Sequence, residues 1–168
     1  QVYHYVKNRN LGDFVHDIAR YKVVVTYNGK CFDIPVIENQ FRIKMRQAHI
    51  DLRYILKSLG YTGGLKGCEK KMGIRRNELD GVDGYFAVLL WRDFLRNHNP
   101  MALQTLLSYN VLDAANLETL MIAAYNLKIK DTPFFETHQL ELPPPVRNPF
   151  DPDLETITRI MGENDRYF

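Results

Sequence analysis

The stretch VVVTYNGKCFD, residues 23–33, decides the fold because it carries the chain from an apolar strand through a turn into a helix. Val23 to Val25 form a short apolar run, which is typical of a strand buried on both faces. Asn28-Gly29 ends the strand, and Asp33 stands in the first turn of the helix that follows. Open α/β sheets bind ligands at the carboxyl ends of their strands, so Asn28 and Asp33 occupy a candidate ligand-binding position. Asp33 could instead serve only as a helix-capping acid that faces the helix dipole.

The rest of the first half alternates strands and helices, and the second half is helical. That order predicts an α/β layer fold in which the helical half covers one face or one end of the sheet. The longest helix could be interrupted near Ser108-Tyr109. The expected strands are 1–6, 22–27 and 48–50, and the expected helices are 11–21, 33–41, 52–59, 65–72, 84–97, 100–127 and 154–161. Asp51 is placed to cap the helix over 52–59.

The composition is that of a soluble globular protein, with 168 residues, 45% of them apolar and 25% charged. We expect two parts, a domain over 1–130 and a proline-rich extension with a short helix over 131–168. The two cysteines lack metal-ligand spacing and predict free thiols in a reducing, cytoplasmic setting, and no apolar stretch is long enough to span a membrane. Because the net charge is only +2, any surface for nucleic acid must be local.

Tyr109 and Asp113 form a second candidate site. They are four residues apart in an apolar-periodic helix, so they lie on the same face about one turn apart. A buried carboxylate needs a partner or a metal, and a phenol beside a metal-held carboxylate can orient a water or hold a phosphate oxygen. Tyr109 could also serve only in core packing, because the same helix is rich in leucine.

The segment from Lys66 to Arg76 is the only concentrated basic stretch. Lys66, Arg75 and Arg76 could neutralise backbone phosphates, although such a run can also be a solvated helix face. The five histidines share no ligand spacing, which argues against a histidine metal site, and no GxxxxGK[ST] phosphate-binding loop is present. Asp153-Leu154-Glu155-Thr156 looks like an acidic metal motif, but it opens a helix after Pro152, so we predict a helix cap there.

Four segments together resemble the ribonuclease H-like 3′–5′ exonuclease superfamily, of the type with four acidic metal ligands and a tyrosine in the last motif. The likeness is greatest to its bacterial ribonuclease H-like branch, with YprB-type domains. The segments are VVVTYNGKCFDIPVI (23–37), AHIDL (48–52), LKGCEKKMGIRR (65–76) and LLSYNVLDAANLETL (106–120).

This resemblance implies a metal-dependent 3′–5′ exonuclease that hydrolyses phosphodiester bonds at the 3′ ends of single-stranded DNA or RNA. It also implies a ribonuclease H-like mixed sheet flanked by helices, and two Mg²⁺ or Mn²⁺ ions held by carboxylates. By the family's motifs, Asp33 and Asp113 would be metal ligands. Tyr109 would orient the attacking water, and Asn28 would shape the substrate cleft.

The family's first motif, Asp-x-Glu on the first central strand, has no counterpart in this chain. We expect upstream truncation, and weak metal binding by these residues alone, because a sheet without its central strand is incomplete. Two alternatives stay open. One is a catalytically inactive ribonuclease H-like module that binds nucleic acid or a protein partner, and the other is an α/β domain whose acids only cap helices.

Overall fold

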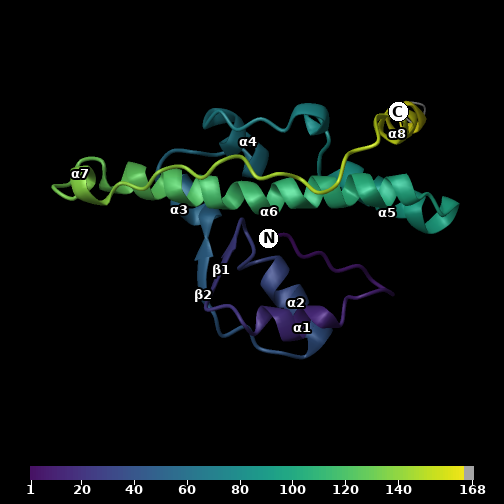
Figure 1. Cartoon of the computed structure of the whole chain (residues 1–168), viewed down its shortest axis with the longest axis horizontal. Coiled ribbons are helices and arrows are strands. Elements are labelled where there is room, and N and C mark those ends of the chain that lie inside the picture. Colours follow the sequence, from purple (N-terminus) through teal and green to yellow (C-terminus); the bar gives the residue numbers. More distant parts are fainter. Residues whose placement is uncertain (165–168) are drawn as a thin grey trace. The chain divides into compact units, whose positions relative to one another are not determined.

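The computed structural model describes residues 1–164 and divides into two compact units. Tyr3–Ile74 and Ala114–Pro144 belong to unit 1. Arg75–Asp113 and the segment from Pro145 onward belong to unit 2. The longest helix, α6 (Pro100–Ile129), contributes its first part to unit 2 and its remainder to unit 1. Figure 1 shows α6 as one uninterrupted helix.

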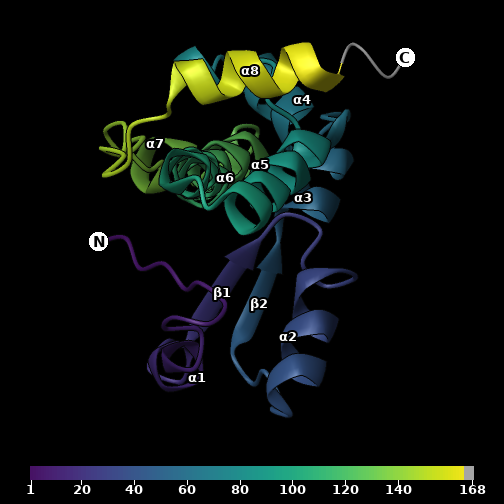
Figure 2. The same cartoon turned by 90° about the vertical axis from the view of Figure 1, so that its right-hand side faces the viewer.

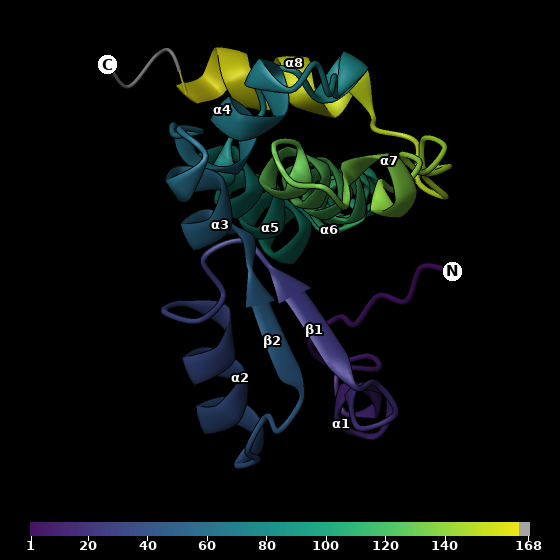
Figure 3. The ribbon, with the colours of Figure 1, turned by 90° about the vertical axis from the view of Figure 1, so that its left-hand side faces the viewer.

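Unit 1 contains a pair of parallel strands, β1 (Val23–Thr26) and β2 (Ala48–Asp51). The register pairs Val23 with Ala48 and Thr26 with Asp51, so both strands end at the same edge. Helix α2 (Asp33–Phe41) connects them and lies alongside the pair (Figures 2 and 3). This strand–helix–strand unit confirms the predicted α/β arrangement, and α1 (Asp13–Ile18) precedes it.

The core of unit 1 forms between α3 (Leu52–Ser58), α4 (Gly64–Lys71) and the second part of α6. On α4, the carboxylate of buried Glu69 accepts a hydrogen bond from the Asn116 side chain of α6 at 2.9 Å, so a polar contact accompanies the apolar packing. The short helix α7 (Phe135–His138) follows α6. The fully packed core side chains are those of Leu52, Leu56, Cys68, Leu120 and Ala124.

Unit 2 packs α5 (Gly84–Asn97), the first part of α6 and α8 (Leu154–Asn164) around a second core, with the short 3₁₀ turn η1 (Asn77–Leu79). Ile157 and Ile160 of α8 belong to this core together with Tyr109 of α6. The Asp153 carboxylate accepts a hydrogen bond from the Thr156 backbone N–H at 2.9 Å. Asp153 therefore caps α8, which confirms the predicted cap.

The predicted strand over 1–6 is wrong. The Val6 backbone N–H donates to the Asn10 side chain at 2.8 Å, and the Val6 carbonyl accepts from the Arg9 backbone N–H at 3.0 Å, so the segment runs into a turn. β-propensity describes how well a residue fits beside a neighbouring strand, and in residues 1–164 the sheet consists of β1 and β2 alone. The expected mixed sheet is therefore a two-stranded parallel one, and Val23 is 47% exposed rather than buried on both faces.

Three smaller differences concern the helical half. The interruption expected near Ser108 is absent from α6, and α7 was not predicted because a single turn carries too little periodicity to be recognised. The units also divide the chain in a different way from the predicted boundary at residue 130, which stays a prediction. Within residues 1–164, none of the helices combines the length and apolar character that crossing a membrane would require.

Candidate active site

The loop after β1 makes a tight turn that depends on its sequence. Asn28 has a left-handed backbone with φ of 65°, which asparagine tolerates better than most residues. A Cβ on Gly29 would lie 2.4 Å from the Thr26 hydroxyl oxygen, so only glycine fits there. The Gly29 backbone N–H donates to that same oxygen at 3.2 Å, and His49 of β2 contacts it at 2.8 Å. Asn28-Gly29 thus folds the chain back over the end of β1.

The carboxylate of Asp51, at the end of β2, holds this loop in place. Its Oδ1 accepts hydrogen bonds from the backbone N–H groups of Asn28 at 2.7 Å and Arg53 at 3.1 Å, and its Oδ2 accepts from that of Lys30 at 3.0 Å. The Arg53 contact is the predicted cap of α3. The other two contacts tie the loop to the neighbouring strand. Asp51 is only 8% exposed, and hydrogen bonds to an ionised carboxylate are stronger than those between neutral groups.

Side chains of α3 complete the surroundings of the loop. Arg53 donates a hydrogen bond from its guanidinium to the Asn28 side-chain oxygen. The Tyr54 hydroxyl lies 3.2 Å from the thiol of Cys31, which is exposed. Local sequence patterns indicate neither Arg53 nor any role of Asp51 beyond capping. Both follow from the register of the parallel strands, which brings the end of β2 beside the loop after β1.

Asp33 is the first residue of α2 and therefore lies at the positive end of that helix. No side chain caps this helix terminus at Phe32. Asp33 is exposed, but the protein partly shields its carboxyl group from water. That desolvation raises the pKa of Asp33 above its ordinary value, the negative charge of Asp51 adds to the increase, and a hydrogen bond to its own backbone opposes it. The structure thus places Asn28 and Asp33 at the two ends of one loop, at the carboxyl end of β1.

In unit 2, Tyr109 and Asp113 lie together on α6, as their spacing predicts. Tyr109 is 6% exposed and its ring belongs to the apolar core. Burial raises the pKa of Tyr109 to about 12, with the charge of Asp113 and a hydrogen bond to it adding to the effect and Arg76 opposing it. The phenol is therefore protonated at neutral pH. Tyr109 packs in the core and also contacts the Asp113 carboxylate. Core packing and a role beside a metal-held carboxylate, the two interpretations of Tyr109, therefore do not exclude each other.

Asp113 has a buried cation as its partner. Arg76 forms an ion pair with the Asp113 carboxylate, and the Arg76 guanidinium carbon lies 5.6 Å from the centre of the Tyr109 ring. The Arg76 side chain is 3% exposed, whereas that of Asp113 is 32% exposed. The structure thus brings together three predicted residues, Arg76, Tyr109 and Asp113, in unit 2.

Of the other predicted phosphate-binding residues, Arg75 belongs to unit 2 and Lys66 to unit 1. Arg75 is exposed and, with Arg76, lines a cavity of about 260 Å³ in unit 2 that Ser108, Asn148 and Phe150 also border. The Asn148 side chain donates at 2.9 Å to both the carbonyl and the hydroxyl oxygen of Ser108, which closes one side of this cavity. Lys66 is half-buried on α4 in unit 1.

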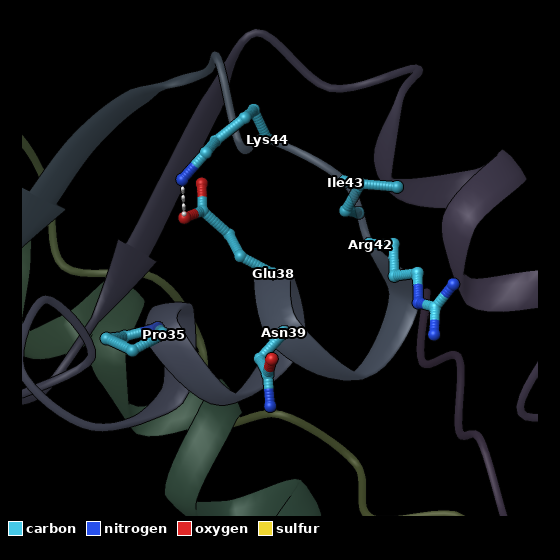
Figure 4. Close-up of a pocket in the computed structure, with 6 residues that line it drawn as sticks. All are labelled: Pro35, Glu38, Asn39, Arg42, Ile43 and Lys44. Carbon is cyan, nitrogen blue, oxygen red and sulfur yellow. Dashed lines mark hydrogen bonds and ion pairs between the residues drawn. The ribbon is translucent and has the colours of Figure 1, made fainter.

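A second, wider cavity of about 510 Å³ lies along α2 and the residues that follow it. Figure 4 shows the Lys44 ammonium directed at Glu38, to which it donates a hydrogen bond at 2.9 Å. That bond, and a second one from the Met45 backbone N–H, lower the pKa of Glu38. Glu38 thus balances the positive charge of Lys44, and Arg42, which also lines the cavity, leaves the lining with one net positive charge.

The donor atoms of the candidate site fit a divalent cation in kind but not in number. Carboxylate oxygens such as those of Asp33 and Asp113 are the hard donors that Mg²⁺ and Mn²⁺ prefer. Within residues 1–164, however, no three histidine, cysteine, aspartate or glutamate side chains are grouped closely enough to hold a metal. Asp33 belongs to unit 1 and Asp113 to unit 2, so each supplies one carboxylate to its own unit.

Comparison with known proteins assigns the family. The family model of the RNase_H superfamily matches residues 2–125. The chain is also similar to the uncharacterized protein YprB of Bacillus subtilis (strain 168), with 32% identity over 111 residues. That alignment covers 59% of this chain and 26% of YprB, so the chain spans much less than the length of this relative. No solved structure matches the chain significantly. The strand–helix–strand unit of this chain agrees with the family match over residues 2–125, and the chain belongs to the RNase H superfamily.

Proposed function

We propose that this RNase H superfamily chain provides part of the active site of a metal-dependent 3′–5′ exonuclease. The observation that carries the proposal is the contact of a protonated, buried Tyr109 phenol with the Asp113 carboxylate on one face of α6. Asp33 adds a second, accessible carboxylate at the carboxyl end of β1, which is where α/β sheets bind ligands. The reaction would be hydrolysis of the terminal phosphodiester bond.

Asp33 and Asp113 are the residues that would hold Mg²⁺ or Mn²⁺. At such a site two divalent cations supply activation of water and stabilisation of the charge that develops at the scissile phosphate. Asp51 would keep Asp33 in place through the loop that it holds. The family's Asp-x-Glu motif, which would supply further carboxylates, has no counterpart on a strand in this sequence.

Tyr109 would orient the attacking water through its hydroxyl oxygen, which can accept a hydrogen bond from the water while the phenolic proton is donated in a hydrogen bond to Asp113. Its pKa of about 12 keeps that proton on the oxygen at neutral pH, so the phenol acts as a hydrogen-bond donor and not as a base. Its buried ring is fixed by the core of unit 2, and a fixed ring holds the hydroxyl in one position beside Asp113.

Single-stranded DNA or RNA with a free 3′ end would be the substrate. Asn28 directs its side-chain oxygen to Arg53, so the amide NH₂ is the part of Asn28 that would contact the nucleic acid. Lys66 and Arg75 would contact backbone phosphates, and Arg76 could do so only when its pair with Asp113 opens. The free thiols of Cys31 and Cys68 suit a reducing, cytoplasmic compartment.

One observation favours a second candidate function, a non-catalytic module that binds nucleic acid or a protein partner. Arg76 already neutralises Asp113, and a carboxylate that serves as the partner of a buried arginine has a structural role without any metal. In that case Asp113 would maintain the fold of unit 2 rather than catalyse a reaction.

Release of nucleotides from single-stranded DNA and RNA tests the proposal, with the protein as its gene encodes it and with Mg²⁺, Mn²⁺ or EDTA. We expect release only with a divalent cation, and a loss of about 100-fold or more in Asp113→Asn. Asp80→Asn is the matched control, because Asp80 is an exposed acid of the same unit and the charge change is identical. Release in EDTA, or full activity of Asp113→Asn, would contradict the proposal. Binding without any release would favour the second candidate.

A further inference from the structure

Arg76 is an internal arginine held in place by the structure around it, and not a mobile surface side chain. Its carbonyl accepts a hydrogen bond from the Leu79 backbone N–H at 3.2 Å, which closes the turn η1. Leu79 is 2% exposed and belongs to the core of unit 2. The backbone of Arg76 is therefore tied to a packed side chain three residues later, while its neighbour Arg75 is exposed.

The pairing of Arg76 with Asp113 satisfies an electrostatic requirement. A guanidinium that is almost completely buried needs an anionic partner, because an unpaired buried charge is strongly destabilising. Asp113 is the partner, and it is the more exposed of the two, so its carboxylate can be reached from solvent while Arg76 approaches it from inside unit 2. The Tyr109 ring lies 5.6 Å from the guanidinium and is itself buried, which limits the positions that the arginine can adopt.

A divalent cation at Asp113 would meet this positive charge at contact distance. The two cations repel each other, and the guanidinium already uses a carboxylate oxygen that a metal would need. Metal binding would therefore require Arg76 to move away from the carboxylate, or to share it at a cost in affinity.

We propose that Arg76 is the resident counter-cation of Asp113, and that it competes with a divalent metal for that carboxylate. This inference rests on the proposed function, in which Asp113 is a metal ligand. Arg76 is then a positioning residue with two effects: it keeps Asp113 in place when no metal is bound, and it sets how tightly unit 2 takes up a metal. A metal that displaced the guanidinium would leave Arg76 available to a substrate phosphate in the cavity that it lines.

Titration of the protein with Mn²⁺, followed by the broadening of backbone amide NMR signals around Tyr109 and Asp113, tests the competition. An arginine within about 4–6 Å changes the affinity of a carboxylate for a proton by one to three powers of ten. We therefore expect Arg76→Gln to bind Mn²⁺ about tenfold more tightly or better, and Arg76→Lys, which keeps the charge, to stay close to wild type. Arg75→Gln is the matched control, because it removes the same charge from the exposed neighbour and should have little effect.

A second measurement needs no variant and covers the case in which Arg76→Gln fails to fold. The Nη1–H protons of Arg76, which donate to Asp113 in the wild-type protein, should exchange faster with water as Mg²⁺ is added, because the metal releases them from the carboxylate. Unchanged exchange at Mg²⁺ concentrations that perturb the Asp113 amide signal would overturn the competition.

The outcomes separate this inference from the proposed function. If Mn²⁺ binds near Asp113 and Asp113→Asn abolishes binding, but Arg76→Gln and Arg75→Gln have equal effects, the metal site stands and the competition is wrong. If Mn²⁺ perturbs no signal near Asp113 in any of the proteins, both the metal role of Asp113 and the competition are wrong.

Discussion

At the scale of single residues, the loop after β1 and the cluster on α6 each depend on one carboxylate. These are Asp51 and Asp113, and their partners lie far away in the sequence. The position of Asp51 directly before a helix is a local signal that predicts its capping role. Its contacts with Asn28 and Lys30, more than twenty residues earlier, depend on strand register and could not be derived from local spacing. The spacing of Tyr109 and Asp113 did predict their contact, whereas the burial of Arg76 beside them needed the tertiary structure.

Asp51 offers a test in which capping and loop attachment are separated. Serine caps helices about as well as aspartate, but it is too short to reach both Asn28 and Lys30. We expect Asp51→Ser to retain α3 and to lose about 2 kcal/mol from the two loop contacts. Because Cys31 is exposed and Cys68 is buried, the rate of thiol modification reports on the loop, and it should rise in this variant.

Asp51→Asn is the matched control for that experiment. Its side-chain oxygen can still accept from Asn28 and Arg53, and only the contact with Lys30 is lost. The modification rate of Cys31 should therefore lie between those of wild type and Asp51→Ser. Equal rates in all three proteins would show that Asp51 does not hold the loop.

Asp33 should make stability depend on pH in a direction opposite to that of most acids. Its pKa is raised in the folded protein, so the folded state binds this proton more tightly than the unfolded chain does. The contribution of Asp33 to the free energy of unfolding is thus highest below the ordinary aspartate pKa of about 3.9, and it falls as the pH rises through the raised pKa of the folded state. We expect Asp33→Asn to unfold at a slightly higher urea concentration than wild type at neutral pH. Below a pH of about 3.9 the two proteins should unfold at the same urea concentration.

The control for Asp33 is Asp13→Asn, which removes another exposed acid from the first turn of a helix in the same unit. Its ordinary helix-dipole interaction should make this variant slightly less stable than wild type at neutral pH. If Asp33→Asn behaved in the same way, Asp33 would be no more than a first-turn acid.

At the scale of elements, hydrophobic periodicity located most of the helices, because each packs one apolar stripe against a core. The predicted helix over 84–97 and the starts of the helices at Asp33, Leu52, Pro100 and Leu154 agree with the structure. The strand over 1–6 was wrong because periodicity cannot show whether a neighbouring strand is present to pair with it. The docking of α8 likewise depends on polar contacts with α5 that no local pattern reveals.

Asp93 should be the residue that fixes α8 to α5. It is buried, and burial alone would raise its pKa, but hydrogen bonds from Arg159, Asn97 and Asn99 outweigh this and lower it. The Arg159 contact measures 2.6 Å. We expect Asp93→Ala to lose about 3 kcal/mol of stability, since it leaves these donors without their acceptor. Trp91 of α5 is the single tryptophan of the chain, so its fluorescence during urea unfolding reports on unit 2.

Asp93 should also make unit 2 less stable at acid pH. Because the folded pKa of Asp93 is lowered, its contribution to stability is complete above the ordinary value of about 3.9 and is lost as the pH falls through the folded value. Asp93→Asn should lack this loss. A wild-type protein whose Trp91 fluorescence transition shifted no more with acid than that of Asp93→Asn would argue against the role assigned to Asp93.

At the scale of the whole molecule, comparison with known proteins assigns the family, and the chemistry is our proposal. Membership in the RNase H superfamily rests on a match over residues 2–125, and the alignment with YprB covers only 26% of that relative. The α/β fold class could be predicted from the order of the elements, and short motifs indicate Asn28, Asp33, Tyr109 and Asp113 as candidate site residues. Short motifs could not predict that these residues are divided between two units, with Asn28 and Asp33 in unit 1 and Tyr109 and Asp113 in unit 2.

The direction of degradation is the measurement that tests the central claim most directly. The substrate is single-stranded DNA or RNA labelled at its 5′ end, with either a free or a chemically blocked 3′ end, incubated with Mn²⁺ and the protein as its gene encodes it. We predict a ladder of labelled products that shortens one nucleotide at a time from the free 3′ end, and no products from the blocked substrate. Internal cleavage, equal degradation of the blocked substrate, or labelled mononucleotide as the first product would contradict 3′–5′ exonuclease activity.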